Sequence, residues 1–456
     1  MDKLQERLAT YACALNYEDL PPAVIHAAKV RVIDTMGALV GGFSGEPCRI
    51  VRAMAALSSS PMAATVLGTR ETSSPEMAAF ANAATARYME SNDVYHWPGS
   101  GGGHPSDTLT PVLAVAEPTH ASGREFINAI VLAYEIYLRV GDATRTPGWD
   151  AATRVVLAVA IAAGKILGLS PEQMAHCISL AVVPNNALGQ TRSGRLSMWK
   201  AVAAGQAGKA GVFAALLARQ GMEGPNLPFE GAAGWFRKVS GEAFALESMG
   251  GRGAPFKILD TIIKARASCG STISSIMAAE RAHASLKSTR DVERVIVEVY
   301  EPAKRGMGTD EVNWRPETRE TADHSIPYVV AAALLDGTVG PRQFTMERIR
   351  DPELMALLQK VEVVSNPEFT KAYESVPVGH STRVEVVTTS GQRHVGEVNS
   401  IKGDTRDPMS DGEIEDKFRI NTLGILSDEW VRSILDRLWQ LEEMENVAEI
   451  PPALVL

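Results

Sequence analysis

The hydrophobic pattern of this 456-residue chain changes its period twice, and no other feature constrains its fold as strongly. From residue 21 to about residue 220, apolar residues recur at helical spacing and alanine is abundant, which indicates closely packed helices. After residue 264, apolar and polar residues alternate as in half-buried strands. Helical spacing returns after residue 408, with an apolar face over residues 430–441. The alternating segments are residues 295–300, residues 361–364 and a hairpin over residues 383–398, with an apolar helix at residues 328–335.

This order of patterns predicts two domains, as expected for a chain too long for one hydrophobic core. The predicted fold class is α with an inserted α+β domain. Residues 1–263 form a large all-helical domain that residues 405–456 complete, and residues 264–404 form the smaller α+β domain. The C-terminal helices are therefore expected to rejoin the first domain.

The net charge of −9 opposes binding to nucleic acid or to an anionic membrane surface, so we expect neither partner. An anionic ligand would need a locally cationic pocket. The four cysteines, at positions 13, 48, 177 and 269, are too far apart for a zinc ribbon or an iron–sulfur run, which favours reduced thiols. The N-terminus lacks an apolar signal core, and no run approaches the roughly 20 apolar residues of a membrane span. We therefore expect a cytoplasmic protein.

A glycine-flanked cluster at residues 92–107 is the first candidate site. It holds Asp93, His96, His104 and Asp107 between two apolar helical runs. Its four glycines permit close approach of a ligand, and loops on a rigid scaffold often carry catalytic groups. One alternative is that Ser106 and Asp107 only cap the next helix while the histidines are solvated. A metal site of Asp93, His96 and His104 is another alternative, although their spacing is not typical of ligand pairs.

Lys200, which begins an alanine-rich helical run, is the second candidate. A cation at a helix start opposes the helix dipole, which indicates that it holds an anion there. The alternative is an ordinary surface lysine. The nearby Gly208 and Lys209 do not form a phosphate loop, because Ala210 stands where serine or threonine is required.

Two further candidate groups follow in the 264–404 block. Lys264 and Arg266 can bind carboxylates at the border of the two domains, where pockets are common, or they can form a basic linker before a helix cap. Cys269 has no base nearby in the sequence, so we do not expect it to be a nucleophile. His324, which follows an acidic residue and precedes an apolar helix, is a further candidate site residue. The alternative is that this histidine has only a structural role.

Four stretches, in this order, resemble the MmgE/PrpD family of 2-methylcitrate dehydratases, cis-aconitate decarboxylases and iminodisuccinate epimerases. Together they span nearly the whole chain. The resemblance implies a large helical domain built from both chain ends with an inserted α+β lid, no metal or other cofactor, and a homodimer. The stretches are residues 92–93 with 104–107; residues 196–200 with 221–225 and 229–231; residues 320–328 with 334–337; and residues 408–411 leading to Lys417 and Phe418.

The resemblance also assigns roles to individual residues. His104, Lys200 and Lys264 match the family's active-site histidine and two lysines, and Tyr328 matches its lid tyrosine. We expect His104 to act as base or acid and the lysines to bind substrate carboxylates. Asp93 is expected to orient His104 or to take part in proton transfer. The other expected site residues are Glu90, for proton transfer, and Ser106, Arg266, Ser268 and His324, for substrate binding.

The chain departs from the family pattern at three of these places. Glu90 and Val94 stand where the loop usually has aspartate and threonine, and Ile273 stands where histidine often follows the lysine segment. Residues 196–200 and 322–328 are most similar to the 2-methylcitrate dehydratase subgroup. This implies a cofactor-independent hydro-lyase of propionate catabolism that takes a proton next to a carboxylate of 2-methylcitrate or a similar hydroxy polycarboxylate. The alternatives are an epimerase or racemase, a decarboxylase of a cis-aconitate-like acid, and an inactive ligand-binding member.

Overall fold

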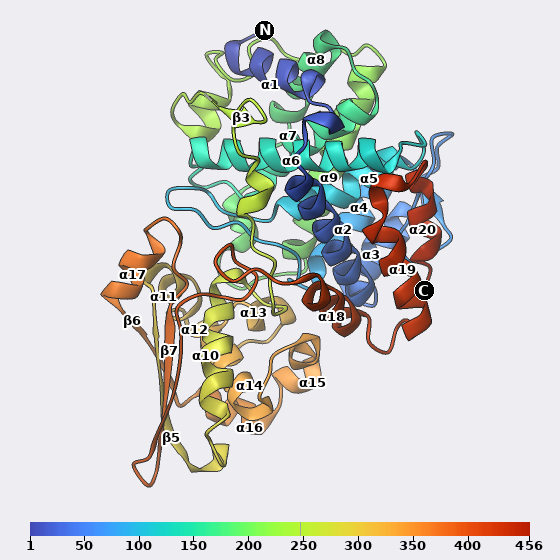
Figure 1. Cartoon of the computed structure of the whole chain (residues 1–456). Coiled ribbons are helices and arrows are strands. Elements are labelled where there is room, and N and C mark those ends of the chain that lie inside the picture. Colours follow the sequence, from blue (N-terminus) through green and yellow to red (C-terminus); the bar gives the residue numbers. More distant parts are fainter. Residues whose placement is uncertain (247) are drawn as a thin grey trace.

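The computed structural model describes residues 1–246 and 248–456 and is mostly helical (Figure 1). Capping signals in the sequence set several helix starts. At the start of α8, for example, the Ser170 hydroxyl accepts a hydrogen bond from the Gln173 backbone N–H, and Pro171 fills the first turn. The helices of the first part are α1 (Lys3–Ala14), α2 (Pro22–Gly42), α3 (Glu46–Ala55), α4 (Pro75–Tyr88), α5 (Leu109–Ala116), α6 (Gly123–Ala143), α7 (Ala152–Ile166), α8 (Pro171–Val182) and α9 (Trp199–Arg219). Two short strand pairs accompany them, β1 (Ala64–Thr65) with β2 (Thr72–Ser73) and β3 (Met249–Gly250) with β4 (Gly253–Ala254).

α9 is the central helix of this part and packs against α4, α7 and α8. Its glycines make the close packing possible: a Cβ on Gly205 would lie 2.3 Å from the Phe80 carbonyl oxygen of α4. Within the described ranges, α9 is also the helix long and apolar enough to cross a membrane, so the sequence-based expectation that no run reaches that length was wrong. Because 72% of its most apolar stretch is buried inside the protein, we interpret α9 as a core helix.

The α+β part is built on a four-stranded sheet with the order β6-β5-β7-β8. β5 (Val292–Val299) runs parallel to β6 (Val361–Ser365) and antiparallel to β7 (Thr382–Thr388), which forms a hairpin with β8 (Arg393–Val398). α10 (Ile273–His283) packs along β7 and β8, and α14 (Ile326–Asp336) packs on α10 (Figure 1). The shorter helices here are α11 (Glu301–Met307), α12 (Glu311–Trp314), α13 (Arg319–Ala322), α15 (Met346–Ile349), α16 (Pro352–Leu358) and α17 (Pro367–Tyr373).

The chain then returns to its first helices. α18 (Asp411–Thr422) and α19 (Asp428–Trp439) pack on α2, and α20 (Ile450–Ala453) ends the helical sequence. Lys417 of α18 forms a buried ion pair with Asp34 of α2 and donates to the Ser91 carbonyl at 2.7 Å. The largest hydrophobic core joins residues between 4 and 263 to residues between 414 and 454, and the next largest lies within residues 276–398. The predicted changes from helices to strands and back are confirmed, whereas the domain boundaries at residues 263 and 404 stay predictions.

Candidate active site

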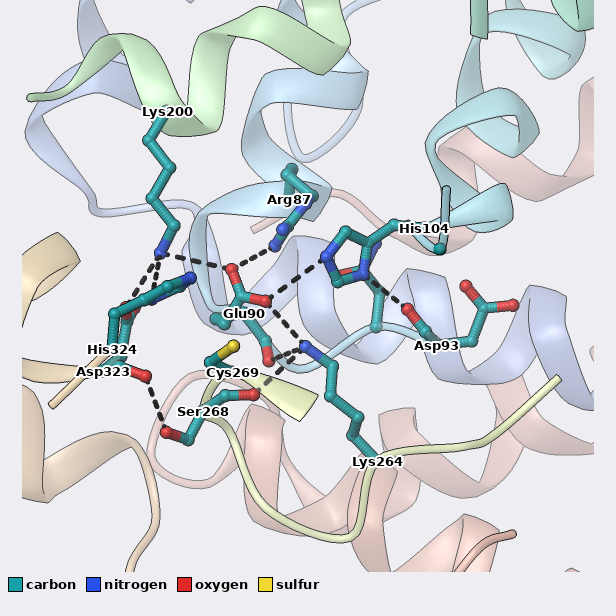
Figure 2. Close-up of polar contacts among 12 residues, drawn as sticks. Arg87, Glu90, Asp93, His104, Lys200, Lys264, Ser268, Cys269, Asp323 and His324 are labelled. Carbon is teal, nitrogen blue, oxygen red and sulfur yellow. Dashed lines mark hydrogen bonds and ion pairs between the residues drawn. The ribbon is translucent and has the colours of Figure 1, made fainter. Parts of the chain in front are cut away.

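A cluster of ionisable side chains is assembled from both parts of the molecule, with Glu90 at its centre (Figure 2). The helical part contributes side chains from the end of α4, from the loop that follows it and from the first turn of α9. The other side is formed by the segment before α10 and by the turn before α14. The members of this cluster are Arg87, Glu90, His104 and Lys200 on the first side and Lys264, Ser268, Cys269, Asp323 and His324 on the second.

Glu90 holds the two sides together. Its Oε1 lies 2.9 Å from Lys264 Nζ, and its Oε2 lies 3.2 Å from Lys200 Nζ and also pairs with Arg87. The Glu90 side chain is only 1% exposed. Its φ of +53° lies in the left-handed region, which strains a residue other than glycine by about 1 kcal/mol or more. The surrounding ion pairs must offset this strain, so the position of this carboxylate is tightly determined.

Glu90 remains ionised at neutral pH. Burial alone would raise the pKa of its carboxyl, but Arg87, Lys264 and Lys200 together lower that pKa well below its usual value. A carboxylate with so low a pKa is a weak base. The geometry therefore favours a role for Glu90 in holding cations, whereas the sequence predicted proton transfer.

His104 faces Glu90 from the start of the short 3₁₀ helix Pro105–Thr108. Its Nδ1 lies 2.7 Å from the Asp93 carbonyl oxygen, which can only accept, so the proton is on Nδ1 and the Nε2 lone pair is free. Nε2 lies 3.6 Å from Glu90 Oε1. Burial, and next the charge of Arg87, lower the pKa of His104 well below its usual value. His104 is therefore a neutral imidazole with its basic nitrogen facing the cluster.

Asp93 orients His104 through its backbone and not through its carboxylate. The carboxylate accepts hydrogen bonds from Tyr134 Oη at 2.9 Å and from the Ser106 backbone N–H at 3.1 Å. Figure 2 shows it pointing away from Glu90. The expectation of an orienting role thus holds for the main chain, and no direct contact supports proton transfer by the side chain.

His324 lies across the cluster from His104 and has the opposite electrostatic environment. Its Nδ1 lies 2.5 Å from Asp323 Oδ1, and Lys200 Nζ lies 2.8 Å from the same oxygen. Burial and Lys200 lower the pKa of His324, but Cys269 and Asp323 outweigh them and raise it to about 9. His324 is therefore protonated at neutral pH.

A metal ion is not needed to explain the convergence of acids and histidine at this point. Glu90, Asp323 and His324 place one ligand atom each within 4.8 Å of one another. The Lys200 ammonium contacts all three, at 3.2 Å from Glu90 Oε2, 2.8 Å from Asp323 Oδ1 and 3.2 Å from His324 Nδ1. The cation position is thus filled by Lys200. The alternative metal site of Asp93, His96 and His104 is not formed, because His96 Nδ1 lies 2.8 Å from His380 Nε2 instead.

The cluster has an excess of positive charge. Arg87, Lys200 and Lys264 face two carboxylates with lowered pKa values, Glu90 and Asp323. The protonated His324 adds a further positive charge, and Asp107, whose pKa burial raises to about 7, contributes only part of a negative one. Burial lowers the pKa of Lys264, so its charge is the most easily lost of the three basic side chains. In a protein of net charge −9, this is the locally cationic site that an anionic ligand requires.

Three predicted site residues point elsewhere. Tyr328 is fully buried in the α+β core and donates its hydroxyl hydrogen to the Gln343 carbonyl. Arg266 forms a two-pronged ion pair with Glu280 at 2.8 and 2.7 Å. Ser106 accepts from Asn92 at 2.8 Å, behind His104. The prediction that these side chains bind or act on a substrate therefore lacks support from the geometry.

Ser268 lies at the edge of the cluster and forms hydrogen bonds with other residues of the cluster. Its carbonyl oxygen accepts from Lys264 Nζ at 3.2 Å, and its hydroxyl donates to the Asp323 carbonyl at 2.8 Å. It therefore fixes the Lys264 segment to the turn before α14.

Sequence reasoning missed Arg87 and Asp323. Arg87 had a usable signal, because it is a charged residue within an alanine-rich apolar helix and is 2% exposed. Asp323 was noted only as the acid that precedes His324. In the structure it is fully buried and fixes both Lys200 and His324.

Two of the three residues that depart from the family pattern lie in one apolar cluster. Val94 and Ile273 belong to a small apolar cluster with Ile262 and Ile401. Both are at most 3% exposed. Both departures therefore place an apolar side chain in this buried cluster at a position where the family pattern has a polar one.

Comparison with known proteins agrees with this picture. Residues 6–247 match the MmgE/PrpD N-terminal domain, and residues 267–441 match the MmgE/PrpD C-terminal domain. The chain belongs to the MmgE/PrpD family. It is 26% identical to a cis-aconitate decarboxylase of Homo sapiens, over 98% of this chain and 93% of the relative. It is 27% identical to a 2-methylcitrate dehydratase of Salmonella typhimurium, over 84% and 82%, and 26% identical to one of Escherichia coli K12, over 89% and 88%.

Proposed function

We propose that this protein is a cofactor-independent lyase that removes water from 2-methylcitrate or a similar hydroxy polycarboxylate. One observation carries the proposal: a neutral His104 and a protonated His324 face each other across a cationic cluster. Two titratable groups whose pKa values are pushed apart are what acid–base catalysis of an elimination needs.

The chemistry follows from these positions. Lys200 and Lys264 bind substrate carboxylates, exchanging part of their contact with Glu90 for contact with the ligand. His104 Nε2 takes the proton next to a carboxylate, and the lysines stabilise the negative charge that develops on that carboxylate. The electron pair then forms the carbon–carbon double bond as the carbon–oxygen bond breaks. His324 donates its proton to the departing hydroxyl, which leaves as water.

Substrate entry requires the cluster to open. The side chains of Glu90, Lys264 and Lys200 are 1%, 0% and 3% exposed, whereas those of His104 and His324 are 13% and 22% exposed. We therefore propose that residues 264–404 act as a lid that moves relative to the helical part. A protease sensitivity of this block that is equal with and without substrate would contradict lid motion.

Two further proposals accompany the lid. One is a cytoplasmic location, and the other is a homodimer, which rests on the family resemblance. Light scattering tests the assembly: a homodimer gives twice the chain mass of 48.9 kDa, and a value of 48.9 kDa would contradict it.

Decarboxylation of a cis-aconitate-like acid is the second candidate. It is supported by the human cis-aconitate decarboxylase, whose similarity extends over 98% of this chain. In this reaction the lysine-bound substrate would lose carbon dioxide, and a protonated side chain would supply the replacing proton.

Nuclear magnetic resonance in deuterated water separates the candidates. The purified protein is incubated in turn with 2-methylcitrate, citrate, cis-aconitate and iminodisuccinate. A dehydratase converts 2-methylcitrate or citrate to an unsaturated acid, and a decarboxylase yields a deuterated product from cis-aconitate. Deuterium entry without loss of a group would instead indicate an epimerase and would overturn the lyase proposal, as would the absence of both turnover and exchange with all four acids.

A further inference from the structure

We propose that Arg192 binds a third carboxylate of the substrate and so makes the site selective for tricarboxylates over dicarboxylates. This inference rests on the proposed function. 2-Methylcitrate and citrate carry three carboxylates, whereas the mechanism above gives only Lys200 and Lys264 as their partners. A third cationic group is needed, because a carboxylate that enters the site without a partner loses its hydration at a large cost in free energy.

Arg192 is an accessible cation that is not used by the charged cluster. Its side chain is 28% exposed, whereas those of Lys200 and Lys264 are 3% and 0% exposed. Arg87, whose side chain is 1% exposed, is already paired with Glu90. An incoming anion can therefore contact Arg192 while the lysines are still covered.

The contact between Arg192 and Asp150 leaves part of the guanidinium free. Nε of Arg192 lies 2.7 Å from Asp150 Oδ2. In the part of the chain that the structure describes, no acceptor binds the two terminal amino groups, Nη1 and Nη2. Together these two groups can donate two parallel hydrogen bonds to one carboxylate, which is the geometry that makes arginine a good carboxylate ligand.

Asp150 holds Arg192 in a fixed position. The Asp150 side chain is only 2% exposed, and its Oδ1 accepts a hydrogen bond at 2.9 Å from the Ala152 backbone N–H at the start of α7. The Asp150 N–H donates to the Ala187 carbonyl at 2.8 Å, which connects the start of α7 to the segment between α8 and α9. A guanidinium that is already held at Nε loses less conformational freedom when it binds a second anion.

Arg192 lies near the proposed base. The residue after its partner, Ala151, packs against the glycine loop: a Cβ on Gly103 would lie 3.0 Å from Ala151 Cβ. Gly103 directly precedes His104. The electrostatics agree with this placement, because burial and next Arg87 lower the pKa of His104, and the charge of Arg192 lowers it further. A substrate bound to His104 can therefore reach the guanidinium.

The neighbours of Arg192 in the sequence face another space. Gln190, Thr191 and Arg195 line a cavity of about 510 Å³ between this segment and α9, whereas Arg192 is bound to Asp150. Arg195 forms an exposed ion pair with Glu317 at 3.3 Å. It is therefore a matched control with the same charge in the same segment.

Calorimetric titration with acids that have no hydroxyl group tests the proposal. The full-length protein is titrated with tricarballylate, which has three carboxylates, and with glutarate and succinate, which have two. We expect wild-type protein to bind tricarballylate at least about tenfold more tightly than either dicarboxylate. Absence of tricarballylate binding, or equal affinity for the three acids, would overturn the proposal.

Two substitutions identify the residue responsible. Arg192→Gln should weaken tricarballylate binding at least about tenfold and dicarboxylate binding less than about threefold, whereas Arg195→Gln should leave all three affinities unchanged. An unchanged affinity for tricarballylate in Arg192→Gln, or an equal loss for the dicarboxylates, would overturn the assignment.

Arg192→Lys separates charge from shape and also decides if Arg192→Gln does not fold. Lysine keeps the positive charge but lacks the planar pair of amino groups. We expect tricarballylate to bind at least about threefold more weakly to Arg192→Lys than to wild type. A wild-type affinity would contradict the two-pronged contact.

Binding and turnover are separate readouts, so this inference and the proposed lyase reaction can fail independently. A protein that eliminates water from 2-methylcitrate but binds tricarballylate equally well in wild type and Arg192→Gln would refute only the role of Arg192. A protein that shows the expected binding pattern but no elimination would refute only the lyase reaction.

Discussion

His104 and His324 flank the same carboxylate cluster, yet their surroundings give them opposite protonation states. His104 has a neutral carbonyl as the partner of Nδ1, and its strongest charged neighbour, Arg87, repels the imidazolium. For His324, burial and Lys200 lower the pKa, but Cys269 and the partner carboxylate of Asp323 outweigh them and raise it to about 9. This difference shows that the surroundings of a histidine, and not the residue type alone, determine whether it acts as an acid or as a base here. Burial beside Arg87 keeps one histidine neutral, whereas Cys269 and Asp323 keep the other protonated.

Removing the base should have the largest effect. His104→Ala deletes the only group that we assign to proton abstraction, so we expect kcat/KM to fall by about 10² to 10⁴-fold. The exposed His120→Asn is the control and should retain wild-type activity. Steady-state kinetics on the substrate identified in deuterated water measure both. Turnover unchanged in His104→Ala would show that His104 is not the base.

The central carboxylate should matter most for stability. Glu90→Gln leaves Arg87, Lys200 and Lys264 without their shared anion, and breaking such a buried ion pair typically destabilises by about 3–5 kcal/mol. Urea unfolding of this variant and of the exposed control Glu362→Gln measures the difference. A decrease in the free energy of unfolding below about 1 kcal/mol would contradict this prediction, because it would mean that other groups balance the charges of the three basic side chains.

Removing the carboxylate behind His324 should make the two histidines more alike. In Asp323→Asn the pKa of His324 should fall from about 9 by at least about one unit, because the charge that raises it is gone. The alkaline limit of activity should then move to lower pH, while the acid limit, set by His104, stays in place. A pH profile of kcat/KM measures this, and an unmoved alkaline limit would contradict the assignment of His324 as the acid.

The same shift predicts a pH dependence of stability. The folded-state pKa of His324, about 9, lies above the unfolded value of about 6.5, so its stabilising contribution is complete below about pH 6.5 and is lost as the pH rises through about 9. Asp323→Asn should reduce this loss, because it removes one of the two groups that raise this pKa. Thermal unfolding of both proteins between pH 6 and 10 checks it, and parallel curves would refute the linkage.

Tyr328→Phe should have the smallest effect. Its hydroxyl donates to the Gln343 carbonyl inside the α+β core, so we expect a loss of about 1 kcal/mol of stability and less than about a threefold change in kcat/KM. A larger loss of activity without loss of stability would return Tyr328 to the active site, as the family resemblance implied.

The fold followed from the sequence more fully than the site did. The alternation of residues 295–300 and 383–398 is a local signal, and the structure has strands at Val292–Val299, Thr382–Thr388 and Arg393–Val398. The cap at Ser170 is also a local signal, and a helix starts there. His104, Lys200, Lys264 and His324 were also named, and the structure brings them into one cluster.

The remaining site features depend on contacts that the sequence does not encode locally. Arg87 lies beside Asp107, and Asp323 forms an ion pair with Lys200, so each has a partner more than 15 residues away in the chain. Tyr328 and Arg266 are near site residues in the sequence, but each finds a stronger local partner, Gln343 and Glu280. The sequence therefore did not show in which direction each of these side chains points.

Nitrogen NMR of the imidazole rings tests the central claim most directly. The protein has nine histidines, so ¹⁵N-histidine labelling with His104→Asn and His324→Asn variants assigns the two signals. We predict that at pH 7.5 His104 is neutral with its proton on Nδ1, while His324 is an imidazolium that titrates near pH 9. Two rings that both titrate near pH 6.5 would contradict the division into base and acid.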